Sequence, residues 1–100
     1  MKITRWTAEI SPKKEILIQL IQAEGLDFTE IEIKSGLKLT NHRTQMREFI
    51  QIIDGELIFN LSGTQFALRP GDKLELPPNT LYSYSNIKND ACTFLSSKTI

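Results

Sequence analysis

The sequence predicts a single domain built mainly of short antiparallel β-strands, arranged as a barrel or sandwich, with one short helix near the N-terminus. Three observations predict this all-β fold. The chain has 100 residues, which is close to the usual size of one domain with one core. Polar turn sequences recur roughly every eight to twelve residues between short apolar or alternating segments. One longer apolar run near the N-terminus has capping residues at both ends.

The N-terminal part, residues 1–25, is expected to contain a first strand that carries Trp6 and a helix over residues 12–24. Ser11 and Pro12 supply an N-cap and a first-turn proline for this helix, and Gly25 supplies a C-terminal glycine. The helix is amphipathic, and its apolar face is expected to pack over one opening of the barrel.

The barrel core is expected to span residues 27–97. Apolar and charged residues alternate over 30–34, which is typical of a strand with one buried face. The Asp-Gly pair at 54–55 and the Ser-Gly pair at 62–63 predict two-residue hairpin turns, because these residues tolerate positive φ angles. The other predicted strands are 49–53, 56–61, 64–68, 73–76, 81–85 and 91–96.

The composition argues against several classes of protein. Twelve basic and twelve acidic residues give a net charge of zero, so the sequence predicts no surface for nucleic acid. Charged residues interrupt the apolar segments, so neither a signal peptide nor a membrane span is expected. Cys92 is the only cysteine, which leaves no internal disulfide and favours a cytoplasmic location. We expect Cys92 to be a buried structural thiol.

Two blocks of residues recur at a fixed spacing that carries a family resemblance. The first block is Gly36, five residues, His42, one residue, Thr44, three residues, Glu48, six residues and Gly55. The second block is Gly71, five residues, Pro77, one residue, Asn79, two residues, Tyr82, three residues and Asn86. Together they resemble the two motifs of the cupin superfamily, G(X)5HXH(X)3E(X)6G and G(X)5PXG(X)2H(X)3N. The resemblance implies one small cupin domain over residues 1–100, folded as a jelly-roll β-barrel.

The resemblance also implies a metal-binding position inside the barrel. In metal-binding cupins, two histidines and a glutamate of the first motif and a histidine of the second hold a divalent metal. The corresponding residues here are His42, Thr44, Glu48 and Tyr82. Imidazole and carboxylate suit iron, manganese, nickel or zinc, whereas a hydroxyl and a neutral phenol are weak ligands. His42 and Glu48 are therefore the candidate metal ligands, and no tightly bound metal is expected.

Three functions stay open at this point. The favoured one is binding of a small molecule in a barrel pocket that has lost its chemistry. Its expected lining residues are His42, Thr44, Glu48, Ile50, Tyr82 and Tyr84. The second is a metal-dependent enzyme of the dioxygenase kind, with a weakly held ion on His42 and Glu48. The third is a metal-independent isomerase or epimerase, with His42 as catalytic base and Tyr82 as catalytic acid.

The partners follow from the same resemblance. Beside the small-molecule ligand, a homodimer is expected, because small cupins commonly dimerise through their sheets. Phe49 and Ile53 have the parity of outward-facing apolar residues and are candidates for that contact. Arg43 and Arg47 have the opposite parity to His42, so they are expected to face away from the pocket.

Overall fold

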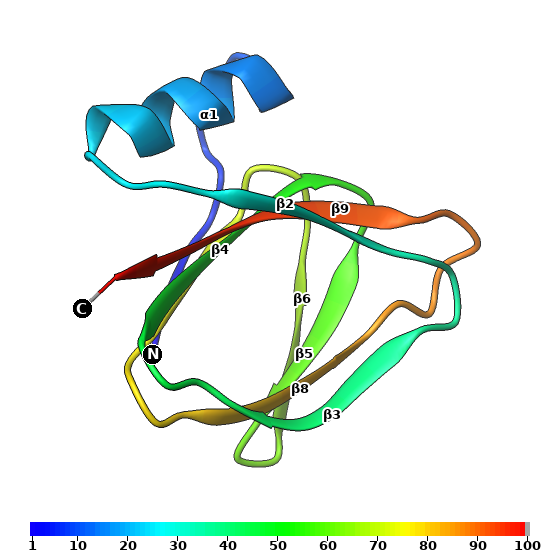
Figure 1. Ribbon diagram of the computed structural model, residues 1–100. Helices are drawn as coiled ribbons and strands as arrows, with labels where there is room; N and C mark the ends of the chain where they lie inside the picture. Colours follow the sequence, from blue (N-terminus) through cyan, green and yellow to red (C-terminus); the bar gives the residue numbers. More distant parts are fainter. Residues whose placement is uncertain (100) are drawn as a thin grey trace.

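Alternating apolar residues along nine short strands bring two antiparallel sheets together in the computed structural model, which describes residues 1–99 (Figure 1). The five-stranded sheet contains, in spatial order, β1 (Lys2–Thr4), β7 (Lys73–Leu76), β4 (Arg47–Asp54), β9 (Cys92–Thr99) and β2 (Thr29–Ile33). The four-stranded sheet contains β3 (Lys38–Arg43), β8 (Leu81–Ser85), β5 (Leu57–Leu61) and β6 (Thr64–Leu68). The predicted all-β jelly-roll barrel is confirmed. The predicted domain ends at Ile100, which lies outside the described residues.

The core lies between the inner faces of the two sheets. Ile50 and Ile52 of β4 face Leu57 and Phe59 of β5, and all four side chains are fully buried. Burial of a side chain of this size contributes about 1.5–3 kcal/mol. From β3 to β6 the chain passes between the sheets twice. This crossing closes the barrel around one continuous core.

Two glycine turns have different roles. Ser62 and Gly63 have φ angles of 52° and 82° and join β5 to β6, as the predicted hairpin requires. The predicted hairpin at 54–55 is wrong, because β4 and β5 belong to different sheets and do not pair. Gly55 instead turns a corner between the sheets at a φ of 83°, where an added Cβ would lie 2.7 Å from the Ala91 carbonyl oxygen.

The helix α1 (Lys14–Ala23) begins two residues later than predicted. Lys13, not Ser11, is the N-cap, and no side chain caps the helix. The Lys13 N–H donates to the Ser11 carbonyl at 2.8 Å. Ser11 and Pro12 therefore belong to the turn that precedes the helix.

The C-terminal end of α1 follows the prediction. Gly25 has a φ of 76°, and its N–H donates to the Gln22 carbonyl at 2.9 Å. The Leu26 N–H donates to the Ile21 carbonyl at 3.3 Å. These two bonds form a Schellman motif, which satisfies carbonyls at the end of the helix.

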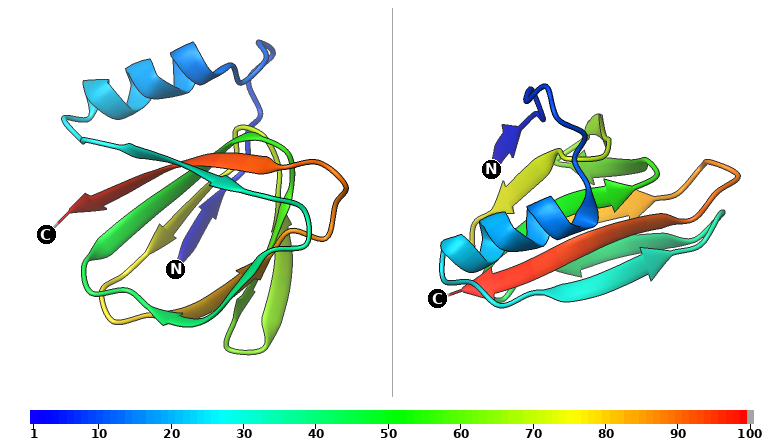
Figure 2. Two further views of the ribbon diagram at one scale, coloured as in Figure 1. Left: turned by 45° about the vertical axis from the view of Figure 1, so that its right-hand side comes forward. Right: turned by 90° about the horizontal axis from the view of Figure 1, so that it is seen from above.

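The position of α1 differs from the prediction. The helix was expected over a barrel opening, but it covers the outer face of the five-stranded sheet (Figures 1 and 2). Leu17 and Ile21 of the helix are buried against Leu95 of β9, with Ile53 of β4 at the edge of the same cluster. Apolar residues on both faces of β4 and β9 make this second cluster possible. The described residues contain no helix long and apolar enough to cross a membrane.

The N-terminal arm is anchored by one carboxylate. Asp72 accepts hydrogen bonds from the Arg69 and Trp6 backbone N–H groups, each at 3.0 Å, and from Arg5 Nη1 at 2.7 Å. Burial raises the pKa of Asp72, but these three donors together outweigh burial and hold the pKa below its ordinary value. Trp6 follows β1 instead of lying on it, and its ring sits against Gly71.

The single cysteine, Cys92, is free and buried at the start of β9, as expected. Burial, followed by the nearby charge of Asp54, raises the pKa of its thiol to about 11. The thiol is therefore neutral at physiological pH and acts as a small apolar group.

Alanine substitutions at Gly55 and Gly63 test how closely the chain approaches itself at the Gly55 corner. Both glycines have φ near 82°, but nothing lies within 4 Å of an added Cβ at Gly63, whereas backbone atoms crowd Gly55. We expect Gly55→Ala to lower the free energy of unfolding by about 1–3 kcal/mol more than Gly63→Ala. Urea denaturation measures both values. Equal losses would contradict the close approach at the corner.

Candidate functional site

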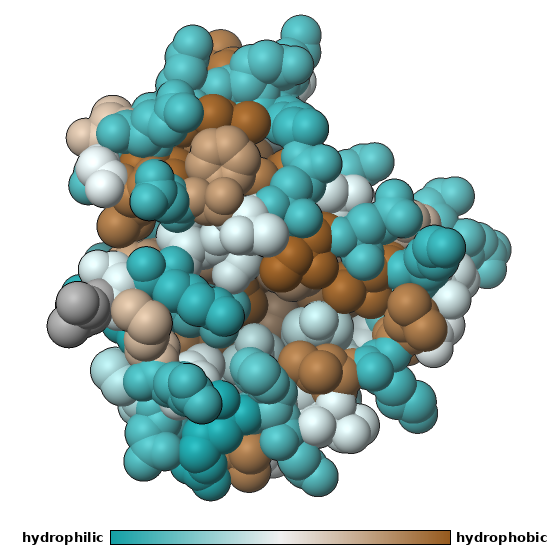
Figure 3. Space-filling view, in the orientation of Figure 1, coloured by the Kyte–Doolittle hydropathy of each residue, from teal (hydrophilic) through white to brown (hydrophobic). Residues whose placement is uncertain are grey.

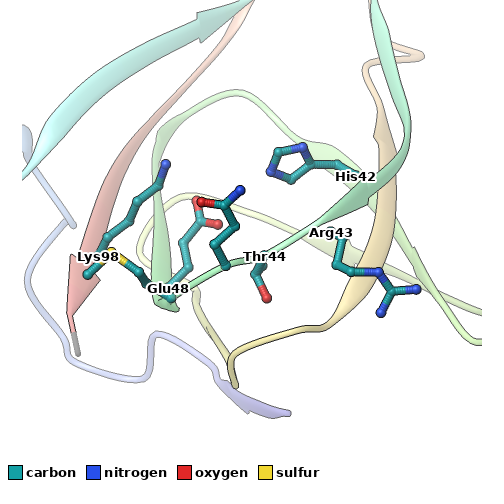
Figure 4. A pocket seen from close by; sticks show the side chains of 7 residues that line it. His42, Arg43, Thr44, Glu48 and Lys98 are labelled. Atoms are coloured by element: carbon teal, nitrogen blue, oxygen red, sulfur yellow. The ribbon is translucent and has the colours of Figure 1, made fainter.

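Three residues of the first motif, His42, Thr44 and Glu48, meet at one end of the barrel, where β3 ends, β4 begins and β9 ends (Figure 4). A cavity of about 300 Å³ opens at this end, which we call the barrel mouth. Its lining residues are His42, Arg43, Thr44, Gln45, Met46, Glu48 and Lys98. The ring of His42 and the carboxylate of Glu48 point into the same space in Figure 4.

Glu48 is the first inward-facing residue of β4 and is only 5% exposed. Its Oε2 accepts a hydrogen bond from the Ser96 hydroxyl at 2.9 Å, and its Oε1 accepts one from the Tyr82 hydroxyl at 3.4 Å. Ser96 lies on β9 and Tyr82 on β8, so the carboxylate joins the two sheets. These bonds compensate for taking a carboxylate out of water.

His42 lies opposite Tyr82 in the pairing of β3 with β8. The two rings are in edge-to-face contact, with centroids 5.3 Å apart and planes at 83°. A register irregularity between Leu39 and His42, with Asn41 at a φ of 52°, precedes the histidine. His42 is exposed, and its side chain makes no hydrogen bond to the other described residues.

Thr44 is buried and ties two loops together. Its hydroxyl donates to the Pro77 carbonyl at 2.9 Å and accepts from the Thr80 N–H at 2.8 Å. Its backbone carbonyl accepts from the Asn79 N–H at 2.7 Å. Asn79 has the left-handed φ of 62° expected for its turn. The hydroxyl of Thr44 is thus already used by the protein, and Figure 4 shows it pointing away from His42 and Glu48.

The remaining predicted pocket residues lie deeper. Tyr82 is 4% exposed, and Ile50 is fully buried in the core. Tyr84 is half-buried and packs edge-on against Phe59 at 5.5 Å and Phe94 at 6.0 Å between ring centroids. These three side chains lie outside the set that lines the cavity at the barrel mouth.

Lys98 completes the barrel mouth and was not predicted from the sequence. It pairs directly across from Glu48 on β9 and shares the inward parity of Ser96. It also lines a second cavity, of about 290 Å³, on the side of β2. The predicted last strand stopped at residue 96, whereas β9 continues to Thr99. Extending the alternation of Phe94 and Ser96 by one step would have placed Lys98 at the mouth.

The comparison with protein families decides the classification. The family described as "Cupin domain" matches residues 29–98. The chain belongs to the cupin family. This confirms the resemblance that the two motifs carry. The chain has no significant match among curated proteins.

Solved cupin structures share the fold of this cupin. One is a cupin superfamily protein from Desulfitobacterium hafniense, at 11% identity and a TM-score of 0.66. The match covers 99% of this chain and 76% of the Desulfitobacterium chain. Another is an RmlC-like cupin from Methanocaldococcus jannaschii, at 21% identity and a TM-score of 0.67. This match covers 74% of this chain and 69% of the Methanocaldococcus chain. A third is the cupin domain of an XRE family transcriptional regulator from Enterobacter cloacae, at 21% identity and a TM-score of 0.64. This match covers 79% of this chain and 85% of the Enterobacter chain.

The donor set at this cupin's mouth does not fit the four-ligand metal site of the family. His42 and Glu48 are the two conventional ligands, and the hydroxyls of Thr44 and Tyr82 are bonded to other protein groups. Within residues 1–99, no three His, Cys, Asp or Glu side chains come together in a group that could hold a metal. Two protein ligands hold a divalent ion weakly.

The tyrosines yield a prediction, because Tyr82 and Tyr84 are the only two in the chain. Burial, and then the charge of Glu48, raises the pKa of both phenols. The neutral phenols therefore contribute stability at pH values below about 10, and this contribution is lost as the pH rises further.

In an ultraviolet titration of the folded cupin, we expect no phenolate absorbance step near pH 10. The absorbance is expected to rise only at higher pH, together with loss of the circular dichroism signal. The same protein in urea serves as the control and is expected to titrate near pH 10. A step near pH 10 with the fold intact would contradict the burial of these phenols beside Glu48.

Proposed function

We propose that this cupin binds a small organic anion that also carries a hydroxyl or amino group, and that it does so at the barrel mouth. The observation that carries the proposal is the meeting of Lys98, His42 and the buried carboxylate of Glu48 around one cavity (Figure 4). The lining of this cavity offers both donating and accepting groups. Lys98 and Glu48 lie side by side on β9 and β4 of one sheet, and His42 lies on β3 of the other sheet.

Lys98 and His42 are the donating groups. Within residues 1–99, no carboxylate oxygen lies within 4.0 Å of the Lys98 ammonium. An unpaired ammonium at a cavity is a binding group for a carboxylate or phosphate, and a charge-assisted hydrogen bond is roughly twice as strong as a neutral one. His42 offers a second donor to the same anionic group.

Glu48 is the accepting group. An ionised carboxylate has about four lone-pair positions, and Ser96 and Tyr82 use two of them. The carboxylate can therefore accept a further hydrogen bond from a ligand hydroxyl or amino group. A small hydroxy acid or amino acid supplies both an anion and a donor. The cavity, at about 300 Å³, suits a ligand of this size.

The contact between His42 and Tyr82 supports binding over acid–base catalysis. A metal-independent isomerase with His42 as base and Tyr82 as acid needs these two groups on opposite sides of the substrate. Here the two rings touch each other, and the Tyr82 hydroxyl already donates to Glu48. A binding role also agrees with the use of a similar barrel as one domain of a transcriptional regulator in Enterobacter cloacae.

Calorimetric titration with glycolate, lactate and malate tests the proposal. We expect Lys98→Met to weaken binding about 10- to 100-fold, because it removes a charged hydrogen bond of about 1.5–3 kcal/mol. Propionate, which lacks the hydroxyl of lactate, is expected to bind more weakly than lactate. Lys88→Met is the matched control, since Lys88 lies outside the cavity lining. Equal affinities for Lys98→Met and the wild type, or no binding of any of these acids, would overturn the proposal.

A further inference from the structure

A second large cavity lies where the N-terminal arm, residues 5–13 between β1 and α1, meets β6 and the turn that follows it. We call it the arm cavity, and its volume is about 790 Å³. Figure 2 shows the arm and β2 on opposite sides of the barrel in the view from above. Within residues 1–99, the lining of the arm cavity shares no residue with that of the barrel mouth. Its lining residues include Arg5, Trp6, Phe66, Arg69 and Asp72.

Arg5 is held in place by only one nitrogen of its guanidinium. Nη1 donates to the Ala67 carbonyl at 2.6 Å and to Asp72 Oδ2 at 2.7 Å. These two acceptors match the two hydrogens of Nη1. Within residues 1–99, Nε and Nη2 donate to no protein group, and the side chain is 49% exposed. The free Nε–Nη2 edge of a fixed guanidinium is suited to bind a carboxylate or phosphate through two parallel hydrogen bonds.

The charges around the arm cavity leave one cation in excess. Arg69 supplies the second guanidinium of the lining, and its side chain is 73% exposed. Its contact with Glu56 is long, at 3.4 Å from Nε to Oε2, and Glu56 also lies 3.7 Å from the Lys88 ammonium. Together with the pair of Arg5 and Asp72, these contacts join three cations to two carboxylates. A ligand with a single negative charge balances this set.

Two aromatic rings form fixed apolar surface in the same cavity. The Trp6 Nε1–H donates to the Ile10 carbonyl at 3.0 Å, and the indole lies so close to Gly71 that an added Cβ there would be 2.5 Å from Trp6 Cγ. The Phe66 ring stacks on Phe59, with planes 9° apart and centroids separated by 5.9 Å. Trp6 and Phe66 nevertheless stay half-buried. Rings held in this way offer contact area to another aromatic ring.

Hydrophobic surface on the opposite side of the barrel lacks such a cation. Figure 3, which looks onto β2 and β3, shows hydrophobic surface between the two strands. Leu37, immediately before β3, is 52% exposed there. Lys38 lies beside it and forms no ion pair within residues 1–99, so no carboxylate orients its ammonium. The arm cavity, by contrast, combines apolar surface with a guanidinium that the protein holds in place.

We propose that the arm cavity binds an aromatic carboxylic acid, at a site separate from the barrel mouth. The carboxylate accepts two parallel hydrogen bonds from Nε and Nη2 of Arg5, and the charge of Arg69 attracts it further. The aromatic ring lies against Trp6 and Phe66. A singly charged carboxylate fits the one excess cation better than a phosphate monoester, which carries a charge of about −1.5 to −2. The volume of about 790 Å³ leaves room for substituents on the ring.

Tryptophan fluorescence tests this site directly, because Trp6 is the only tryptophan in the chain and lines the arm cavity. The probes are phenylacetate, phenylacetamide and cyclohexylacetate, and none of them absorbs where tryptophan is excited. We expect phenylacetate to change the Trp6 emission in a saturable titration. Phenylacetamide, which has no charge, is expected to bind about 10-fold more weakly or worse. Cyclohexylacetate, which has no aromatic ring, is expected to bind about 2- to 10-fold more weakly than phenylacetate.

Calorimetric titration of variants with phenylacetate locates the carboxylate. Arg5→Lys keeps a cation beside Asp72 but loses the Nε–Nη2 edge, so we expect it to weaken binding about 10-fold or more. Arg69→Met is expected to weaken binding by a smaller factor, because it removes an attracting charge. Arg47→Met is the matched control, since Arg47 is an exposed arginine outside the lining of the arm cavity and its loss changes the net charge equally. This control is expected to bind phenylacetate like the wild type.

Circular dichroism and thermal unfolding establish that each variant is folded. The comparison of the three probes on the wild type needs no variant and stands even where Arg5→Lys loosens the arm. An unchanged Trp6 emission, equal affinities for phenylacetate and its amide, or wild-type affinity in both Arg5→Lys and Arg69→Met would overturn the proposal. Loss of phenylacetate binding in Lys98→Met, with Arg5→Lys unaffected, would place the acid at the barrel mouth and would also overturn it.

Discussion

The hydrogen bonds to the buried carboxylate of Glu48 are the interaction on which the arrangement of the barrel mouth depends. Glu48 belongs to the five-stranded sheet, and Tyr82, which donates to it, belongs to the other sheet. Ser96 fixes the second oxygen from the neighbouring strand. The carboxylate therefore links the two sheets at this end and places an acceptor in the cavity wall. An unsatisfied carboxylate at this depth would be strongly destabilising.

Two of the four positions that correspond to metal ligands in metal-binding cupins, Thr44 and Tyr82, have structural roles here. The Thr44 hydroxyl holds the loop after β3 against the turn at 77–80, and the Tyr82 ring supports His42. The polar groups that still face the cavity include those of His42, Glu48 and Lys98. These are the groups that the proposed hydroxy acid or amino acid would contact.

Motif spacing predicted the fold well because glycine and asparagine turns restrict where strands begin and end. β7 and β8 have the predicted bounds, and Asn79 adopts the predicted left-handed conformation. The sheet that each strand joins could not be predicted in this way, since a polar residue followed by glycine marks a turn in the sequence both in a hairpin and in a corner. At 54–55 only Gly55 has a positive φ, whereas Ser62 and Gly63 both do at the hairpin. Lys98 was missed because it is far from both motifs in sequence and reaches the mouth only through the pairing of β9 with β4.

The most direct test is an X-ray structure of crystals soaked with both lactate and Mn²⁺, with anomalous data collected to locate the metal. We expect density for the organic acid at the barrel mouth, with its carboxylate at Lys98 and its hydroxyl at Glu48, and no anomalous peak between His42 and Glu48. A manganese ion bound to both of these side chains would contradict the proposed binding site.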